Sequence, residues 1–144
     1  MILQHFHGFK DGSDATCAGV EQDANNDGII DLLETRPVSG VTLVPFHDDP
    51  ASLKIKTHTY PKADAEGRIM YVKTVSTSAL ESAMQQKYGI SEMEWEKRVI
   101  YLHGVPEDTE LPESVQSLPD VPAHITLPVS CGPIQRISGS SPMD

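Results

Sequence analysis

The chain has 144 residues and a formal net charge of −10, because 21 acidic side chains outnumber 11 lysines and arginines. This length predicts one domain that buries a core of its own. The acidic balance argues against nucleic acid and anionic lipid as partners, because phosphate groups bind to a basic face. With no run of about 18 apolar residues to span a membrane, we expect neither a nucleic-acid nor a membrane partner. Divalent cations are compatible with the charge.

The first predicted element is a strand over residues 2–8, within the opening stretch QHFHGFKDGSDATC. His5 and His7 are two residues apart, so on a strand both rings point to the same face and can reach one ion. Gly8 then frees the backbone to turn. The first residues have neither the basic region nor the apolar region of a signal peptide, so none is expected there.

The next element is a loop of acidic and amide residues, 23–34, with the sequence DANNDGIIDLLE. Calcium binds hard oxygen ligands, and a loop of twelve residues supplies them from positions 1, 3, 5, 7, 9 and 12, with glycine at position 6. Gly28 is at the sixth position, and Ile30 at the eighth is expected to point into the core. The alternative is an acidic surface loop that matches by chance. The sequence favours a calcium site with the ligands Asp23, Asn25, Asp27, the carbonyl of Ile29, Asp31 and Glu34.

This loop is predicted to stabilise the fold rather than to regulate it. A regulatory EF-hand needs a helix on each side and usually a partner loop. Gly19 and Pro37 crowd the flanks, and the sequence has no second loop of this kind. We therefore expect calcium to tie down a long connection in a β fold.

Three further runs of apolar and β-branched residues predict strands over 40–46, 52–59 and 67–76. In the second run, apolar residues alternate with lysine and histidine, so one face of that strand is expected to contact water. His47 follows the first of these strands, and His58 lies at the end of the second.

One helix is predicted over residues 79–88, in the sequence ALESAMQQKY. Ser78 and Glu81 form a capping-box pattern before it, and Gly89 fits a C-terminal cap. The same capping pattern over 91–94 predicts a short second helical turn.

The last part of the chain predicts strands over 98–105 and 124–131. Between them, residues 105–123 are rich in proline and acid, which is typical of a long ordered loop or lid. The predicted organisation is one β domain over residues 1–137 and a disordered tail over residues 138–144.

The six histidines are candidates for a second metal site. Neutral imidazole is a good ligand for copper and zinc, and His103 lies on a predicted strand before a glycine, as His7 does. The alternative is that each histidine is a surface residue or a satisfied core residue. The His-x-His pair, with further histidines at strand ends, leaves the two interpretations about equal. The histidines are His5, His7, His47, His58, His103 and His124.

The two cysteines, Cys17 and Cys131, also allow two interpretations. In a reducing compartment they are two buried thiols. As a disulfide they close a long loop, which stabilises the fold by roughly 4–5 kcal/mol in the chain-entropy model. The residues alone leave both open. A disulfide would indicate an extracytoplasmic compartment, and the sequence gives no other sign of the location.

Five stretches of the chain carry a resemblance to a known family: HFHGFKDGSDATC, VPFHDDP, KTHTYPKADAEGRI, VIYLHGV and LPVSCGPI. They resemble segments of the copper–zinc superoxide dismutases. The first is similar to the metal-binding strand and disulfide loop, and the last to the segment of the second disulfide cysteine. The resemblance covers about residues 4–134, with insertions at the acidic loop and the helix. The HxHG motif is also similar to that of bacterial dismutase-like and chordin-type (CHRD) domains.

The resemblance implies a mainly β fold, a Greek-key immunoglobulin-like sandwich or barrel of the dismutase type. It implies a disulfide between Cys17 and Cys131. It also implies that copper or zinc binds to histidines, with His47 as the bridging ligand and His58 as a zinc ligand. The implied ligands are His5, His7, His47, His58 and His103.

The chain departs from the family pattern at three places. It begins at the His-x-His strand, so the three family strands before that one have no counterpart. Thr59, Tyr60 and Pro61 stand where a zinc-binding aspartate is expected, and one zinc histidine has no counterpart. Pro128 stands at the position of the arginine that guides superoxide. The copper-like half of the site is therefore present in the sequence, whereas the zinc half and the steering charge are not.

Three functions follow from these residues. The first is copper-dependent superoxide dismutation at the His-x-His site, although an acidic chain without the arginine is poorly suited to an anionic substrate. The second is metal binding without turnover. The third is a calcium-stabilised β domain for adhesion or assembly. A sheet without its neighbouring strands leaves an exposed edge, which favours a homo-oligomer.

Overall fold

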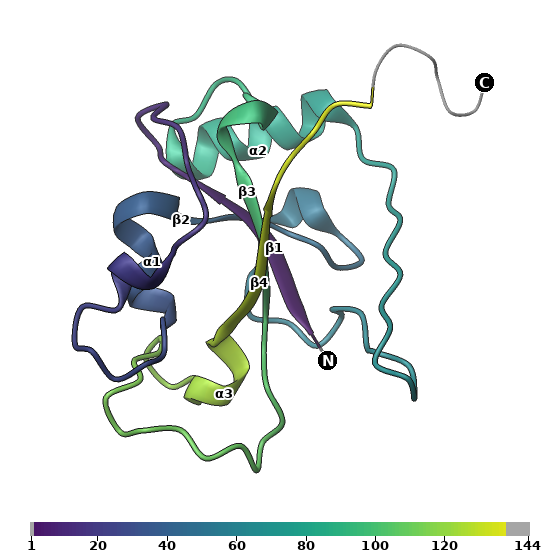
Figure 1. Cartoon of the computed structure of the whole chain (residues 1–144). Helices are drawn as coiled ribbons and strands as arrows, with labels where there is room; N and C mark the ends of the chain where they lie inside the picture. The colour runs from purple at the N-terminus through teal and green to yellow at the C-terminus, as the bar shows by residue number, and fades with distance from the viewer. Residues whose placement is uncertain (1, 138–144) are drawn as a thin grey trace.

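Four antiparallel strands form one sheet in the computed structural model, which describes residues 2–137 (Figure 1). The sheet has the order β2-β1-β3-β4, so the N-terminal strand lies in its interior. Both neighbours of that strand reach it through long connections. The strands are β1 (Leu3–Gly8), β2 (Val41–Pro45), β3 (Val99–His103) and β4 (Pro128–Pro133).

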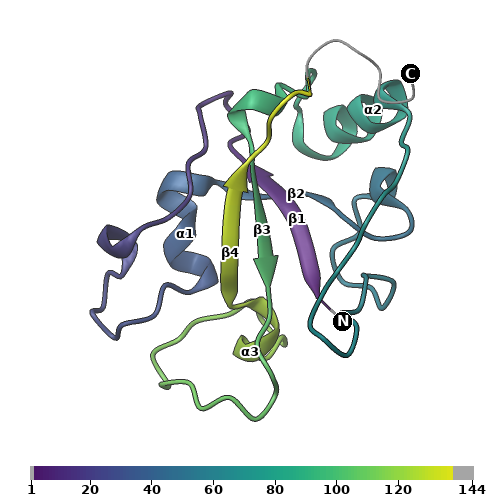
Figure 2. The ribbon, with the colours of Figure 1, turned by 45° about the vertical axis from the view of Figure 1, so that its right-hand side comes forward.

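Helices lie on both sides of this sheet, with α1 to one side and α2 to the other (Figure 2). None of the helices within residues 2–137 has the length and apolar character needed to cross a membrane. The α-helices are α1 (Leu32–Ser39), α2 (Thr77–Tyr88) and α3 (Ala123–Thr126), and the 3-10 turns are η1 (Val20–Gln22), η2 (Pro50–Ser52) and η3 (Trp95–Lys97).

The strand register assigns alternate residues to two faces. Leu3 pairs with His103 and His5 pairs with Tyr101, so these side chains share one face of the sheet. Phe6 points to the other face. There it joins the main apolar core, to which α2 contributes Leu80 and Met84 and η3 contributes Trp95.

The helix predicted over 79–88 is confirmed, and it begins slightly earlier, at Thr77. Ser76 rather than Ser78 is the N-terminal cap, because its hydroxyl accepts a hydrogen bond from the Ala79 N–H. The helix ends at Gly89 in the left-handed region, as predicted. The helical turn predicted over 91–94 is wrong, since the turn that forms is η3.

The strands predicted over 2–8, 40–46 and 98–105 are confirmed as β1, β2 and β3, whereas the strand predicted over 52–59 is wrong. In this segment, side chains rather than a neighbouring strand donate hydrogen bonds to two of the backbone carbonyls. Lys87 donates to the Leu53 carbonyl, and the Tyr60 hydroxyl donates to the Ile55 carbonyl. The alternating pattern was therefore a poor guide in this segment.

The strand predicted over 67–76 is also wrong, because the segment runs alongside the domain without pairing. Met70 and Val72 are 88% and 84% exposed, so these two apolar residues do not face a core, whereas Val75 packs against the main core. The strand predicted over 124–131 is partly right: α3 forms first, after Pro122, and β4 follows from Pro128.

The antiparallel β part of the predicted fold is confirmed, with more helix than the single element expected. A sandwich needs a second sheet, and residues 2–137 form only this one, so the sandwich or barrel stays a prediction. The predicted disordered tail, residues 138–144, lies outside the described residues.

A disulfide joins Cys17 to Cys131, with their Cα atoms 5.8 Å apart. This confirms the pairing that the resemblance implied, and a disulfide is consistent with an oxidising compartment. It ties the loop after β1 to β4. Two backbone hydrogen bonds hold the same loop, from the Ala15 N–H to the Lys97 carbonyl and from the Thr16 N–H to the Val38 carbonyl.

Gly40, between α1 and β2, lies against the backbone of Gly8 on β1. Its φ is +76°, and a Cβ atom there would overlap the Gly8 carbonyl. Gly67 has a similar φ of +79°, but nothing lies within 4 Å of the position of its Cβ. The two glycines therefore share the same backbone strain but differ in steric contact.

We expect Gly40→Ala to lower the free energy of unfolding by about 3 kcal/mol or more, and Gly67→Ala by only about 1 kcal/mol. The difference between the two losses of stability measures the close contact of Gly40 with the backbone of Gly8 on β1. Urea unfolding followed by far-UV circular dichroism tests it, and equal losses in the two variants would contradict the close approach.

Candidate metal centre

Three histidines gather on one face of the sheet, and together they can hold a metal ion. His5 and His7 come from β1 and His103 from β3, and their side chains are 3%, 1% and 1% exposed. The ring centroids lie 4.8 Å apart for His5 and His103, 5.4 Å for His7 and His103, and 5.6 Å for His5 and His7. One ligand nitrogen from each ring lies within 4.8 Å of the others.

Most nitrogens of these rings have no hydrogen-bond partner. His103 is held by its Nδ1, which donates to the Thr126 carbonyl at 2.8 Å, so its Nε2 carries a lone pair. His7 Nε2 lies 3.4 Å from the Thr42 hydroxyl. Unpartnered buried nitrogens are His5 Nδ1, His5 Nε2, His7 Nδ1 and His103 Nε2.

This arrangement fits a metal ion. A buried polar atom without a partner costs roughly 1–3 kcal/mol, so an interior with four such nitrogens is expensive unless a ligand binds them. Metal-binding histidines commonly hold one ring nitrogen with a carbonyl and offer the other to the ion. His103 shows this arrangement directly.

Burial keeps the three rings neutral. It lowers the pKa of His7 to about 3 and that of His103 to about 4, with His103 itself adding to the effect on His7. The pKa of His5 falls well below its usual value, first because of burial and then because of the neighbouring His103. Neutral imidazole is the form that binds metal ions, so the group needs no deprotonation near neutral pH.

Two tyrosines form the walls of the group. The ring of Tyr101 lies 4.8 Å from that of His7, and its hydroxyl accepts from the Ala18 N–H and shares a hydrogen bond with Ser39. Tyr60 meets His5 edge-on, with 5.7 Å between the centroids, and burial raises its pKa. Both tyrosines are fixed in place, so they limit how far the imidazoles can move.

A cavity of about 220 Å³ reaches this group at His7. Its walls come from α1 and β2 on one side and from Ile55 and Lys56 on the other. Through it, a small molecule can approach a histidine that is otherwise almost completely covered.

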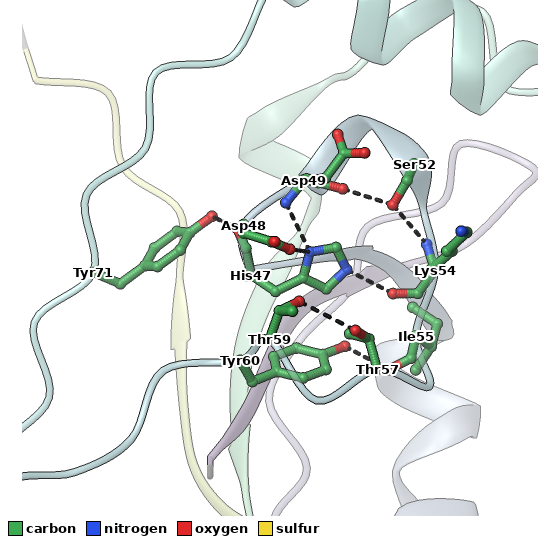
Figure 3. A network of polar contacts seen from close by, with 10 residues as sticks. All are labelled: His47, Asp48, Asp49, Ser52, Lys54, Ile55, Thr57, Thr59, Tyr60 and Tyr71. Atoms are coloured by element: carbon green, nitrogen blue, oxygen red, sulfur yellow. Dashed lines mark hydrogen bonds and ion pairs between the residues drawn. The ribbon is translucent and has the colours of Figure 1, made fainter.

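His47 lies beside the group but does not join it. Its Nε2 donates to the Lys54 carbonyl at 2.7 Å, and its Nδ1 accepts from the Asp49 N–H at 3.0 Å (Figure 3). Its ring also contacts Tyr60, at 5.2 Å between centroids. Because both nitrogens have backbone partners, the bridging role implied by the resemblance has no free ligand atom in this arrangement.

The other predicted histidines lie apart from the group. His58 is exposed and His124 half-buried, and neither belongs to the set of ligand atoms that converge. The implied zinc role of His58 therefore gains no support from its position, because it belongs to no group of three converging metal-binding side chains within residues 2–137.

The acidic loop brings a second set of ligand atoms together, from Asp23, Asp27 and Glu34, each within 4.8 Å of the others. Backbone N–H groups orient these carboxylates: Gly28 donates to Asp23, and Ala24 donates to Glu34. This geometry brings three of the predicted calcium ligands to one point.

The other predicted positions of the loop differ. Asp31 is 1% exposed and caps α1, accepting from the Glu34 N–H through one oxygen and from the Gln116 N–H through the other. Asn25 accepts from the Asp27 N–H at 3.1 Å. Ile30 is only half-buried rather than in the core.

Helix α1 differs from the expectation that Pro37 crowds the flank of the acidic loop. It forms because Asp31 and Glu34 make a complete capping box at its start. Pro37 is tolerated near its C-terminal end. The loop thus has an α-helix after it and only the 3-10 turn η1 before it.

The connection before β4 links the two groups. The Ser114 hydroxyl donates to Asp27 at 2.6 Å, which lowers the pKa of that carboxylate. Ser117 shares a hydrogen bond of 2.8 Å with the Thr126 hydroxyl. Thr126 is also the residue whose carbonyl holds His103. This role of Thr126 could not be predicted from the sequence, because any residue type can supply a backbone carbonyl.

Comparison of the chain with protein-family models, with curated proteins and with solved structures found no match. The fold and the site therefore define its class: a small antiparallel β domain, closed by a disulfide, with a buried group of three histidines that can hold a metal ion.

The metal-free protein should lose stability as the pH falls below about 6.5. In the unfolded chain the histidines take up protons below this pH, whereas in the folded protein they stay neutral until the pH reaches their lower pKa values. Each buried histidine therefore lowers the free energy of unfolding by up to about 1.4 kcal/mol per pH unit. Urea unfolding in a chelator, from about pH 7 to about pH 4.5, measures this slope.

The variant His7→Asn lacks one of the titrating rings and should show a shallower slope. His58→Asn, which changes an exposed ring, serves as the control. A free energy of unfolding that stays constant over this range would contradict the neutral buried state of the rings.

Proposed function

We propose that this chain is a copper-binding β domain whose ion is held by His5, His7 and His103, with calcium bound in the acidic loop. The observation that carries the proposal is that three buried imidazoles each bring one ligand nitrogen within 4.8 Å of the others, while four nitrogens of these rings have no hydrogen-bond partner. An all-imidazole site suits copper or zinc better than calcium or magnesium.

The protein's own residues supply the coordination. His103 is oriented by Thr126, and the Thr42 hydroxyl lies close enough to His7 to orient that ring as well. His5 lies on the same face as His7 and His103, and both of its ring nitrogens are without a hydrogen-bond partner. Copper in such a site supplies one-electron redox chemistry, which zinc does not. The resemblance to copper–zinc dismutases at the same three histidines supports copper.

Superoxide dismutation is the second candidate, supported by the resemblance and by the cavity that reaches His7. In that reaction two superoxide ions and two protons give dioxygen and hydrogen peroxide. The three histidines would hold the copper ion, which would supply the one-electron chemistry of this reaction, and Tyr60 and Tyr101 pack against the rings of His5 and His7. Non-catalytic metal binding uses the same residues without turnover.

We expect the wild-type protein to retain about one copper ion per chain after dialysis, and His5→Ala/His7→Ala to lose it. Mass spectrometry measures the metal content, and nitrogen hyperfine structure in the electron paramagnetic resonance spectrum reports imidazole ligands. His58→Ala is the matched control and should keep its copper. Far-UV circular dichroism verifies the fold of each variant.

Copper retained by the double variant would refute the histidine site. An equal loss in His58→Ala would show that the exposed histidines account for the binding. Superoxide disproportionation by wild type but not by His5→Ala/His7→Ala would favour the dismutase over the non-catalytic alternative.

Calcium should bind through the acidic loop. We expect Glu34→Gln to weaken calcium binding by about 100-fold, because it removes a ligand charge, while the exposed Asp108→Asn leaves the affinity unchanged. Isothermal titration calorimetry measures both. Equal affinity in wild type and Glu34→Gln would show that the carboxylates of this loop do not form a calcium site.

A further inference from the structure

The cavity that reaches His7 has an unusual charge for this protein. Its lining includes two cationic side chains, Arg36 from α1 and Lys56 from the segment after η2, and it contains no carboxylate. In the whole chain, acidic residues outnumber lysines and arginines 21 to 11. The lining of this cavity is therefore positively charged in a protein whose net charge is negative.

Neither cation is neutralised by a neighbour. Within residues 2–137, neither Arg36 nor Lys56 forms an ion pair with a carboxylate. Both residues are exposed, which places them at the outer part of a cavity whose inner wall includes the buried His7. The positive charge of Arg36 is felt at His7, where it adds to the lowering of the pKa.

The remaining lining suits a small guest. Leu32, Val41, Ile55 and Leu118 supply apolar walls, and the Thr42 hydroxyl supplies a polar group next to His7. A volume of about 220 Å³ is large enough for an inorganic anion or a short carboxylate. Low-dielectric walls concentrate the field of the two cations along the cavity.

We propose that Arg36 and Lys56 form a binding site for a small anion beside the histidine group, so that the substrate or co-ligand of this centre is anionic. The inference rests on the proposed function, since the anion would bind next to the ion held by His7. The two cations come from α1 and from the segment after η2, which line the same cavity.

Arg36 is more specific to this cavity than Lys56. Lys56 also lines an adjoining cavity of about 270 Å³, whose lining includes the carboxylate of Asp120. Of these two cavities, Arg36 lines only the one at His7. The two substitutions are therefore expected to differ, with the larger effect at Arg36.

Azide binding to the copper-loaded protein tests the proposal, because the azide–copper(II) absorption band reports a small anion at the metal. We expect Arg36→Gln to weaken azide binding by about 5- to 10-fold and Lys56→Gln by about 2- to 5-fold. Lys54→Gln is the matched control: it removes the same charge from the same segment, at a residue outside the cavity lining, and should change the affinity less than about 2-fold.

Copper content is measured on every sample, so loss of the metal is distinguished from loss of the anion. A second arm uses the metal-free protein and thiocyanate. The amide signals of Gly40 and Thr42, which line the cavity, should shift in wild type and shift less in Arg36→Gln. This arm tests the anion site even if the chain binds no copper.

Equal weakening by Lys54→Gln and Arg36→Gln would overturn the proposal, because net charge would then account for the effect. Unchanged azide affinity in Arg36→Gln, with copper retained, would also overturn it. Selective weakening in the cavity variants, together with selective thiocyanate shifts, would establish the site.

Discussion

The structure depends on the burial of three imidazoles beside an interior strand of its only described sheet. Four of their nitrogens have no hydrogen-bond partner, and the interior in which they lie holds the rings neutral. A fold that simply maximised stability would place apolar side chains here, because unsatisfied polar atoms in a core are costly. Their presence makes this face of β1 and β3 the candidate metal-binding site of the domain.

The rest of the chain covers that face. The disulfide holds the loop after β1 against β4, and α1 follows from a loop whose carboxylates converge on one point. The connection before β4 contacts that loop through Ser114 and positions His103 through Thr126. The acidic loop and His103 therefore both contact the connection before β4.

Charge is distributed to match this arrangement. The protein as a whole is strongly acidic, which suits a cation in the loop and repels anions from most of the surface. The cavity at His7 is different, because its charged lining residues are Arg36 and Lys56. A small anion in this cavity would therefore meet two cationic side chains and no carboxylate.

The sequence by itself determined three local features. His5 and His7 share a face, because side chains alternate along a strand. Residues 23–34 gather carboxylates, because their spacing is that of a calcium loop, and residues 79–88 form a helix. Only the tertiary structure decided which distant residues complete the site. His103 joins because β3 pairs with β1 in a register that brings it beside His5, and His47 does not because backbone groups already engage both of its nitrogens. The segments 52–59 and 67–76 had the pattern of strands but no partner strand, and strand pairing is a property of the whole fold rather than of a short run of residues.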